Sequence, residues 1–227
     1  MSSKILIVLT GVEKYPSMDR ATGVWLGEAV HFVEPVEKAG FTVDYVSPRG
    51  GYTPIDPHSL AMASPVDWEW YQNKAFMNRL GATLKPSEVN ADEYAAVYYV
   101  GGHGVMWDFP DNEELQAISR RVYERGGVVS GVCHGVVGLL NIRLSNGDLL
   151  IAGKRVTGFS NEEEKLAQLD QHVPFLTEDT LTARGAVYEK ASQPWDSFAV
   201  ADQRVVTGQN PASGRAVADL VIAQLGR

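Results

Sequence analysis

Residues 125–140 read Arg-Gly-Gly-Val-Val-Ser-Gly-Val-Cys-His-Gly-Val-Val-Gly-Leu-Leu and contain the only cysteine of the chain, Cys133. The β-branched run before the cysteine predicts a short buried strand, and the apolar residues after it have the spacing of one helix face. Gly131 and Gly135 flank the cysteine in a G-x-Cys-x-G pattern. This pattern is typical of a sharp strand-to-helix turn that presents a nucleophile. The stretch therefore predicts an α/β fold with a reactive residue at a strand end.

The position of the cysteine has a consequence for its charge. A thiol at the start of a helix feels the positive end of the helix dipole, which lowers its pKa from about 8.5 to about 3.5–7.5. We therefore expect Cys133 to have an exposed side chain and to be a thiolate at neutral pH. The alternative is a small buried hydrophobic residue, as most free cysteines are. The flanking glycines favour the nucleophile.

Buried strands alternate with helices along the chain. Continuous apolar runs at 4–9, 41–47 and 95–100 predict further strands of the same sheet. Strand, helix and strand in this order imply parallel pairing with right-handed crossovers. The predicted fold is a doubly wound, mostly parallel α/β sheet with helices on both faces. Active sites of such sheets lie at the carboxyl ends of the strands.

The remaining elements are shorter. The first helix is expected at 22–39, with Thr22 as its N-cap and with a kink or break at Pro35. Asn146-Gly147 marks a turn, and the segments 149–151 and 155–157 that follow it are expected to form a hairpin or edge pair around Gly153. Further helices are expected at 112–125, 161–169, 177–183 and 212–225, and short strands at 186–189, 198–201 and 204–207.

We expect one domain over residues 1–227, interrupted by an irregular insertion at about 50–85. The insertion is rich in proline, aspartate and tryptophan and holds a short helical stretch near 70–80. Insertions of this length are often functional.

Composition excludes several classes of protein. The net charge of −8 argues against nucleic acid or an anionic membrane as the main partner. The chain has no apolar run near the length of about 20 residues that spans a bilayer. A single cysteine cannot form an internal disulfide and suits a reducing compartment. We expect a soluble, cytoplasmic protein.

Two other segments could meet the cysteine. The strand at 95–100 ends in Gly101-Gly-His-Gly104, so the backbone N–H groups of Gly102 and His134 could together bind an oxyanion. Glu28 lies among apolar residues of the first helix, where burial would raise its pKa, although a solvated helix glutamate is the commoner case. His134 is a candidate acid or base, but adjacency in sequence does not ensure contact in space.

A metal site is not expected from the sequence. The other histidines are scattered and show no ligand spacing such as H-x-x-x-H; they are His31, His58, His103 and His172.

At these residues the chain resembles the ThiJ/PfpI superfamily, which has the flavodoxin-like, class I glutamine amidotransferase-like fold. The resemblance covers essentially the whole chain, and within the superfamily it is nearest to the glutathione-independent glyoxalase III branch. The segments that carry it are Val132-Cys-His-Gly135, Gly101-Gly-His-Gly104, Glu28, Val156-Thr-Gly-Phe159, Val206-Thr-Gly-Gln-Asn-Pro-Ala-Ser213, Glu88-Val-Asn-Ala-Asp-Glu-Tyr94 and Pro194-Trp-Asp196.

The resemblance implies roles for particular residues. Cys133 would be the nucleophile with His134 beside it, and a buried Glu28 would hydrogen-bond the sulfur. An acidic residue after the Thr-Gly-Phe segment would orient His134. Here the chain has three consecutive glutamates, so this residue is Glu163 or Glu164, with Glu164 favoured by ungapped counting.

The implied activity is a lyase of the D-lactate dehydratase type that converts methylglyoxal or a related 2-oxoaldehyde to a 2-hydroxy acid. It would need no cofactor or metal, and the resemblance suggests a homodimer. The alternatives are a protein deglycase or peptidase using the same cysteine, a stress-response holdase chaperone, and a cysteine redox sensor. An amidotransferase is disfavoured because it requires a late His-x-Glu pair, and no histidine follows His172.

Overall fold

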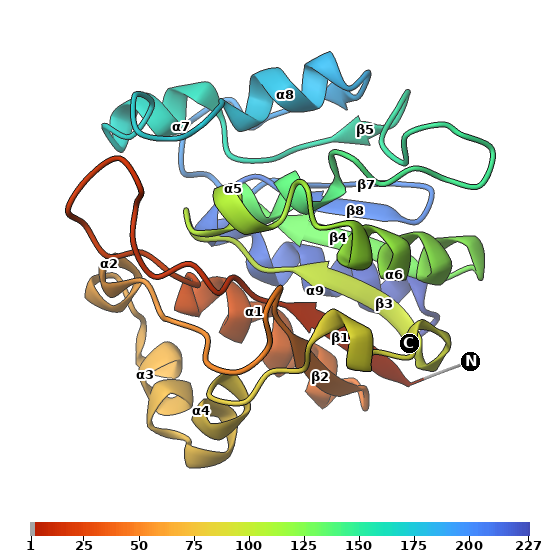
Figure 1. The fold of residues 1–227 in the computed structure, drawn as a ribbon, viewed down its shortest axis with the longest axis horizontal. Coiled ribbons are helices and arrows are strands. Elements are labelled where there is room, and N and C mark those ends of the chain that lie inside the picture. The colour runs from red at the N-terminus through yellow and green to blue at the C-terminus, as the bar shows by residue number, and fades with distance from the viewer. Residues whose placement is uncertain (1–2) are drawn as a thin grey trace.

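The computed structural model describes residues 3–227, which form a six-stranded sheet in the order β2-β1-β3-β4-β8-β7 (Figure 1). All neighbouring strands are parallel except β7, which runs antiparallel to β8 at one edge. The predicted doubly wound, mostly parallel sheet is confirmed. The strands are β1 (Lys4–Val8), β2 (Thr42–Val46), β3 (Tyr94–Tyr99), β4 (Val128–Val132), β7 (Ala199–Asp202) and β8 (Val205–Gly208).

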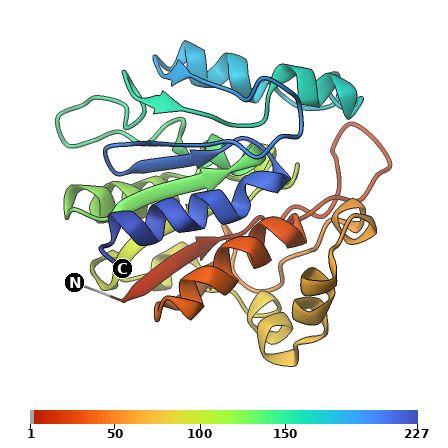
Figure 2. The same cartoon turned by 180° about the vertical axis from the view of Figure 1, so that it is seen from behind.

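Helices cover both faces of this sheet (Figures 1 and 2). Figure 2 shows α1 and α9 lying side by side across one face, and α6 covers the other. The helices are α1 (Leu26–Lys38), α2 (Pro57–Ala61), α3 (Pro65–Gln72), α4 (Lys74–Leu80), α5 (Val105–Asp108), α6 (Glu113–Glu124), α7 (Asn161–Leu166), α8 (Thr177–Ala183) and α9 (Gly214–Gln224). Short 3₁₀ segments lie at Pro86–Glu88, Ala91–Glu93 and Pro211–Ser213.

The alternation of side chains along β1 builds a core on each face. Ile5 and Ile7 pack in one buried cluster with the apolar faces of α1 and α9. Leu6 and Val8 point the other way, into a second cluster with α6. Because both faces are covered, the strands are apolar throughout and their carboxyl ends are the free edge where a site can form.

The first helix differs from the prediction at its start and at Pro35. It begins at Leu26, after Trp25, because the Thr22 hydroxyl donates to the carboxylate of Asp56 instead of capping the helix. It also continues through Pro35 to Lys38, so the expected break is absent. Pro35 is buried, and tertiary packing of this face against the core outweighs the loss of one helical hydrogen bond.

The insertion at 50–85 contains the capped helices α2, α3 and α4. Asp56 caps α2, Ser64 forms a capping box with Asp67 on α3, and Asn73 caps α4. Phe76 of α4 is buried in the same cluster as α1. The insertion is thus anchored to the core, beside the amino-terminal end of α1 (Figure 1).

Two local predictions were wrong. The segment after Cys133 is a 3₁₀ helix, Cys133–Leu139, rather than an α-helix. The hairpin at 149–157 does not form, because β5 (Arg155–Val156) pairs in parallel with β6 (Val187–Tyr188) in a separate sheet. By contrast, the short strands expected at 198–201 and 204–207 are present as β7 and β8, which pair antiparallel across a turn at 203–204. No helix within residues 3–227 is long and apolar enough to cross a membrane.

Candidate active site

Cys133 follows the last residue of β4 and adopts a left-handed backbone conformation, with φ of 56°. Such a conformation costs a non-glycine residue on the order of 1–3 kcal/mol and is often found at active sites. The glycines on either side allow the turn. A side chain at Gly135 would collide with the carbonyl oxygen of Tyr99 on the neighbouring strand. The predicted elbow is therefore present, with its strain at the cysteine.

The sulfur of Cys133 contacts the imidazole of the next residue. Its Sγ lies 3.4 Å from Nδ1 of His134, and the other ring nitrogen, Nε2, lies 2.6 Å from Oε2 of Glu164. An ionised carboxylate can only accept, so Nε2 of His134 carries the hydrogen and Nδ1 of the neutral ring is an acceptor facing the thiol. His134 can therefore take the thiol proton.

Glu164 is brought to this place by the start of α7. The Phe159 N–H donates to the carbonyl oxygen of Cys133 at 3.3 Å, which ties the segment before α7 to the elbow. Ser160 then caps α7 and forms a capping box with Glu163. The first turn of the helix consequently points Glu164 at His134.

The neighbouring Glu163 has a different set of partners. One of its oxygens accepts from the N–H and hydroxyl groups of Ser160. The other accepts from the Trp195 N–H at 2.9 Å and from the Asn210 amide at 2.9 Å. Of the two glutamates that the sequence left open, Glu164 is the one in contact with His134, and Glu163 fixes the surrounding chain.

Glu28 is fully buried on α1, not solvated. Its Oε2 accepts the Gly101 N–H at 2.8 Å, and its Oε1 has no hydrogen-bond partner among the described residues. Burial raises the pKa of Glu28 to about 8, against the smaller opposing effects of the Cys133 thiol and the Gly101 N–H. At neutral pH the carboxyl is mostly protonated and can donate a hydrogen bond towards the sulfur.

The expected thiolate and the expected exposure of Cys133 were both wrong. The side chain is buried, with 2% of the residue exposed. Burial and the neighbouring Glu28 raise the pKa of the thiol, which outweighs the favourable N–H of His134. The thiol is therefore activated by proton transfer to His134 rather than by a standing negative charge, and this disfavours a peroxide-sensing cysteine.

His103 is a residue of the site that sequence spacing missed. Its Nε2 lies 2.8 Å from Oε1 of Glu164, so each oxygen of this carboxylate is bonded to one histidine. Although burial opposes ionisation, His134 and His103 together lower the pKa of Glu164. Burial and the nearby His134 lower the pKa of His103 to about 4, so it is neutral at pH 7. The available signal was the Gly-Gly-His-Gly motif, whose glycines predict backbone donors but do not indicate a contact between its histidine and Glu164.

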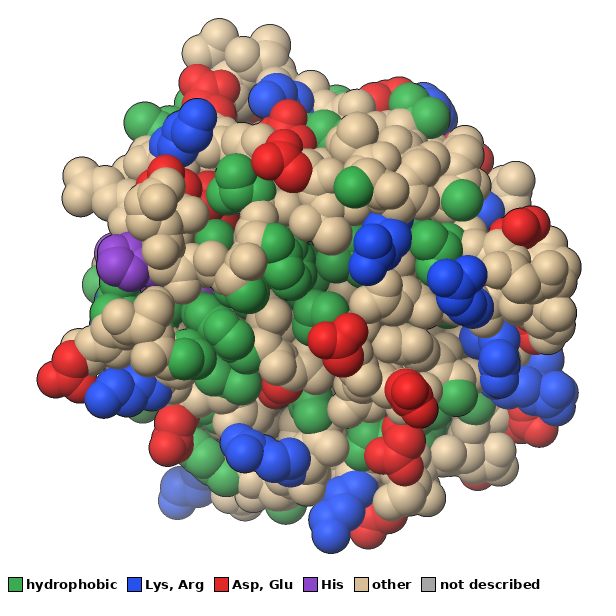
Figure 3. Space-filling model, turned by 45° about the horizontal axis from the view of Figure 1, so that its top comes forward, with side chains coloured by type: hydrophobic (Ala, Val, Ile, Leu, Met, Phe, Trp, Pro, Cys, Tyr) green, Lys and Arg blue, Asp and Glu red, His purple; other side chains and the backbone are tan. Residues whose placement is uncertain are grey.

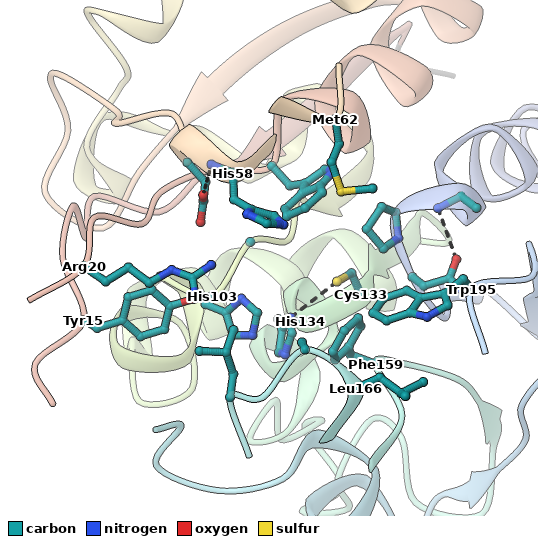
Figure 4. A pocket seen from close by; sticks show the side chains of 18 residues that line it. Tyr15, Arg20, His58, Met62, His103, Cys133, His134, Phe159, Leu166 and Trp195 are labelled. Atoms are coloured by element: carbon teal, nitrogen blue, oxygen red, sulfur yellow. Dashed lines mark hydrogen bonds between the residues drawn. The ribbon is translucent and has the colours of Figure 1, made fainter. Parts of the chain in front are cut away.

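A cavity of about 590 Å³ opens in front of these residues (Figure 4). Its walls are mainly aromatic and aliphatic, and they include Trp25, Phe159 and Trp195. Arg20 adds positive charge at the end that holds Tyr15 (Figure 4), and Asp56 is a second charged residue of the lining. Gly102, with φ of 103°, and His134 also line the cavity, so both residues proposed for oxyanion binding lie at it. The cavity fits a small organic molecule.

Residues 21–224 match the DJ-1/PfpI family. The chain belongs to this family. It is 37% identical over 227 residues to the Saccharomyces cerevisiae protein named glutathione-independent glyoxalase HSP31, which covers 95% of this chain and 94% of the yeast protein. It is 34% identical over 230 residues to glyoxalase 3 of Candida albicans, covering 97% of both chains.

Solved structures also match this chain over nearly its full length. The Rapid Encystment Protein 24 kDa of Francisella tularensis has a TM-score of 0.95 and 36% identity, and all of both chains is covered. The glyoxalase III of Candida albicans has a TM-score of 0.89 and 33% identity over 97% of this chain and 96% of that one. The suspected superfamily and glyoxalase branch are thus confirmed.

In this member of the DJ-1/PfpI family, the donor atoms of His103, His134 and Glu164 lie within 4.8 Å of one another, near enough to surround a metal ion. Both imidazole Nε2 atoms, however, point at Glu164 oxygens at hydrogen-bond distance. We therefore interpret the cluster as a hydrogen-bond network in which each histidine donates to one oxygen of Glu164.

Proposed function

We propose that this protein is a glutathione-independent glyoxalase that converts methylglyoxal, or a related 2-oxoaldehyde, into a 2-hydroxy acid. For methylglyoxal the product is D-lactate. The observation that carries the proposal is the contact of the Cys133 sulfur with His134, whose ring is held in turn by Glu164. Relatives of this chain that bear the name glutathione-independent glyoxalase support the choice of substrate.

The reaction begins with the thiol. His134 takes the proton from Sγ, and the sulfur adds to the aldehyde carbon to form a hemithioacetal. The protonated Glu28 beside the sulfur avoids a second buried negative charge at this stage. Backbone N–H groups of Gly102 and His134 stabilise the oxyanion that develops on the former aldehyde oxygen.

The hemithioacetal then isomerises. His134 removes the hydrogen from the former aldehyde carbon and returns it to the adjacent carbon, through an enediol. The product of this step is a thioester of the 2-hydroxy acid. Water hydrolyses the thioester, which releases the acid and restores the Cys133 thiol. Every step uses groups of this chain and water.

The surface charge and the apolar cavity also support a small-molecule substrate. Figure 3 shows charges of both signs spread over the face it displays, without a broad basic area that would bind nucleic acid. The apolar cavity is suited to a small uncharged carbonyl compound. We also propose a homodimer, supported by the family resemblance, and a cytoplasmic location, supported by the single unpaired cysteine.

The test is D-lactate formation from methylglyoxal in the absence of glutathione, with wild type, Cys133→Ala and His172→Gln. His172 does not line the cavity and serves as a control. We expect turnover in wild type and in the control, and none in Cys133→Ala, whose circular dichroism should match wild type. Turnover by Cys133→Ala would refute the proposal. Release of amines from glycated peptides without lactate formation would favour a deglycase instead.

A further inference from the structure

We propose that His103 is a second proton-transfer residue of this site, which moves a proton between the two substrate oxygens while His134 moves one between the two carbons. The inference rests on the glyoxalase function proposed above. It starts from the observation that one carboxylate, Glu164, holds two histidines, of which the mechanism so far uses only one.

The protonation state of His103 follows from its partner. Glu164 is an acceptor, so the Nε2 of His103 that contacts it at 2.8 Å must carry the hydrogen. Burial and His134 lower the pKa of His103 to about 4, so the ring holds only this hydrogen at pH 7. The second nitrogen, Nδ1, therefore has a free lone pair. It has no hydrogen-bond partner among residues 3–227.

That nitrogen belongs to a residue of the cavity wall. His103 lines the cavity, and 7% of the residue is exposed. Its ring lies 4.0 Å from the ring of His134, centroid to centroid, and Tyr15 flanks it on the other side at 5.6 Å. Figure 4 shows His103, His134 and Cys133 following one another along the cavity. A substrate bonded to the sulfur thus extends past both imidazoles.

The proposed reaction needs two separate proton movements. In the hemithioacetal, the carbon attached to sulfur carries one hydrogen and one hydroxyl, and its neighbour is a ketone. In the thioester product, the first carbon is a carbonyl, and the second carries one hydrogen and one hydroxyl. One proton therefore passes from carbon to carbon and another from oxygen to oxygen.

His134 alone is poorly placed for both movements, because Nδ1 is its only free nitrogen and that nitrogen faces the sulfur. We assign the steps as follows. His134 removes the hydrogen from the first carbon, which leaves an enediolate. Nδ1 of His103 then takes the hydroxyl proton of the first oxygen and gives it to the second. Finally, His134 protonates the second carbon as the first oxygen closes to the thioester carbonyl. Both rings end neutral, and no bond or proton is unaccounted for.

Two substitutions separate this role from simple support of Glu164. In His103→Gln, the side-chain amide can replace Nε2–H as donor to Glu164, but it cannot transfer a proton. In His103→Asn, the amide lies at the place of Nδ1, and the bond to Glu164 is lost. A purely structural His103 predicts an active Gln variant and an impaired Asn variant. Proton transfer predicts that both are impaired.

The experiment measures kcat and KM for methylglyoxal, the rate of Cys133 alkylation by iodoacetamide, and the mass of the quenched enzyme. In His103→Gln we expect kcat to fall about 100-fold, the usual size of one acid–base contribution, with KM and alkylation changed less than about threefold. Mass spectrometry should find substrate bound to Cys133 during turnover. Equal kcat in His103→Gln and wild type would overturn the inference while leaving the glyoxalase function intact. A wild type without lactate formation would instead refute the function itself.

Discussion

Glu28 and Gly101 are joined by a hydrogen bond in which the buried carboxyl accepts the backbone N–H at 2.8 Å. The bond crosses from α1 to the end of β3, and it fixes the acid against the strand end next to the cysteine. A side chain at Gly101 would collide with the Glu28 oxygen. Glycine is therefore needed at position 101 so that the Glu28 carboxyl can approach the backbone. This carboxyl is a titratable group buried away from solvent.

This burial predicts an unusual dependence of stability on pH. The pKa of Glu28 is raised to about 8 in the folded protein from 4.5, so between these values the unfolded chain releases a proton that the folded protein keeps. The stabilising contribution is complete below pH 4.5 and is lost as pH rises through about 8. The slope is at most about 1.4 kcal/mol per pH unit.

Glu28→Gln removes this titration and keeps an acceptor for the Gly101 N–H. We expect its free energy of unfolding, relative to wild type, to rise between pH 5 and pH 8, because only wild type loses stability from this group. Urea denaturation of both proteins at several pH values measures the difference, and the other titrating groups cancel in it. A difference that stays constant over this range would contradict a buried, protonated Glu28.

Substitution of Glu164 should mainly lower activity, and substitution of Glu163 should mainly lower stability. Glu164→Gln leaves one carbonyl oxygen for two histidine donors, and its amide faces the other N–H. We expect kcat to fall by about 100-fold or more, since His134 loses its orientation. Glu163→Gln instead weakens bonds to Ser160, Trp195 and Asn210, and so should lower stability by about 1–3 kcal/mol.

Parallel kinetics and thermal unfolding of the two variants provide the comparison. Glu163→Gln should retain more activity than Glu164→Gln at a temperature where both are folded. The reverse order would mean that Glu163 orients the histidine in solution.

The strand-end turn at Cys133 makes Gly135 sensitive to a single methyl group. In Gly135→Ala, the new carbon would collide with carbonyl oxygens of Tyr99 and Val100, which are backbone atoms of the central strand and cannot move aside cheaply. We expect a loss of at least about 2 kcal/mol in stability together with loss of turnover. Gly81→Ala is the matched control, because its new carbon meets ordinary contacts of 3.4 Å and beyond at the end of α4. A Gly135→Ala protein as stable as wild type would show that the elbow can relax.

The sheet and the turn at Cys133 could be predicted from the sequence because local residue patterns specify both. Apolar runs define β1 and β3, and the glycines around Cys133 define the turn. The charge state of the thiol could not be derived in the same way. It depends first on burial of Cys133 in the folded protein and then on Glu28, which is far away in sequence and approaches only once α1 packs on the sheet.

The contact between His103 and Glu164 and the pairing of β5 could not be derived from local sequence patterns either. His103 and Glu164 are 61 positions apart, and nothing in either segment indicates that they meet. The Asn146-Gly147 turn does form, but it brings Arg143 and Leu149 together in an antiparallel bridge. The partner of β5 is β6, about thirty residues further along the chain. Pairings of this kind are decided by tertiary packing, which a local pattern does not contain.

The size of the cavity leads to a prediction about substrate range. At about 590 Å³ it is in the range that holds a drug-sized molecule, and methylglyoxal fills only a small part of it. Trp195 lines this space and lies 5.7 Å from Phe159, ring to ring, so an aromatic substituent on the 2-oxoaldehyde can pack against them.

We expect phenylglyoxal to have a lower KM than methylglyoxal. Trp195→Ala should raise the KM for phenylglyoxal about tenfold and change that for methylglyoxal little, because a methyl group has much less apolar surface than a phenyl ring to pack against the indole. Trp68→Ala, on α3 and outside the cavity, is the control and should leave both constants unchanged. Equal effects of Trp195→Ala on the two substrates would place the aromatic ring elsewhere in the cavity.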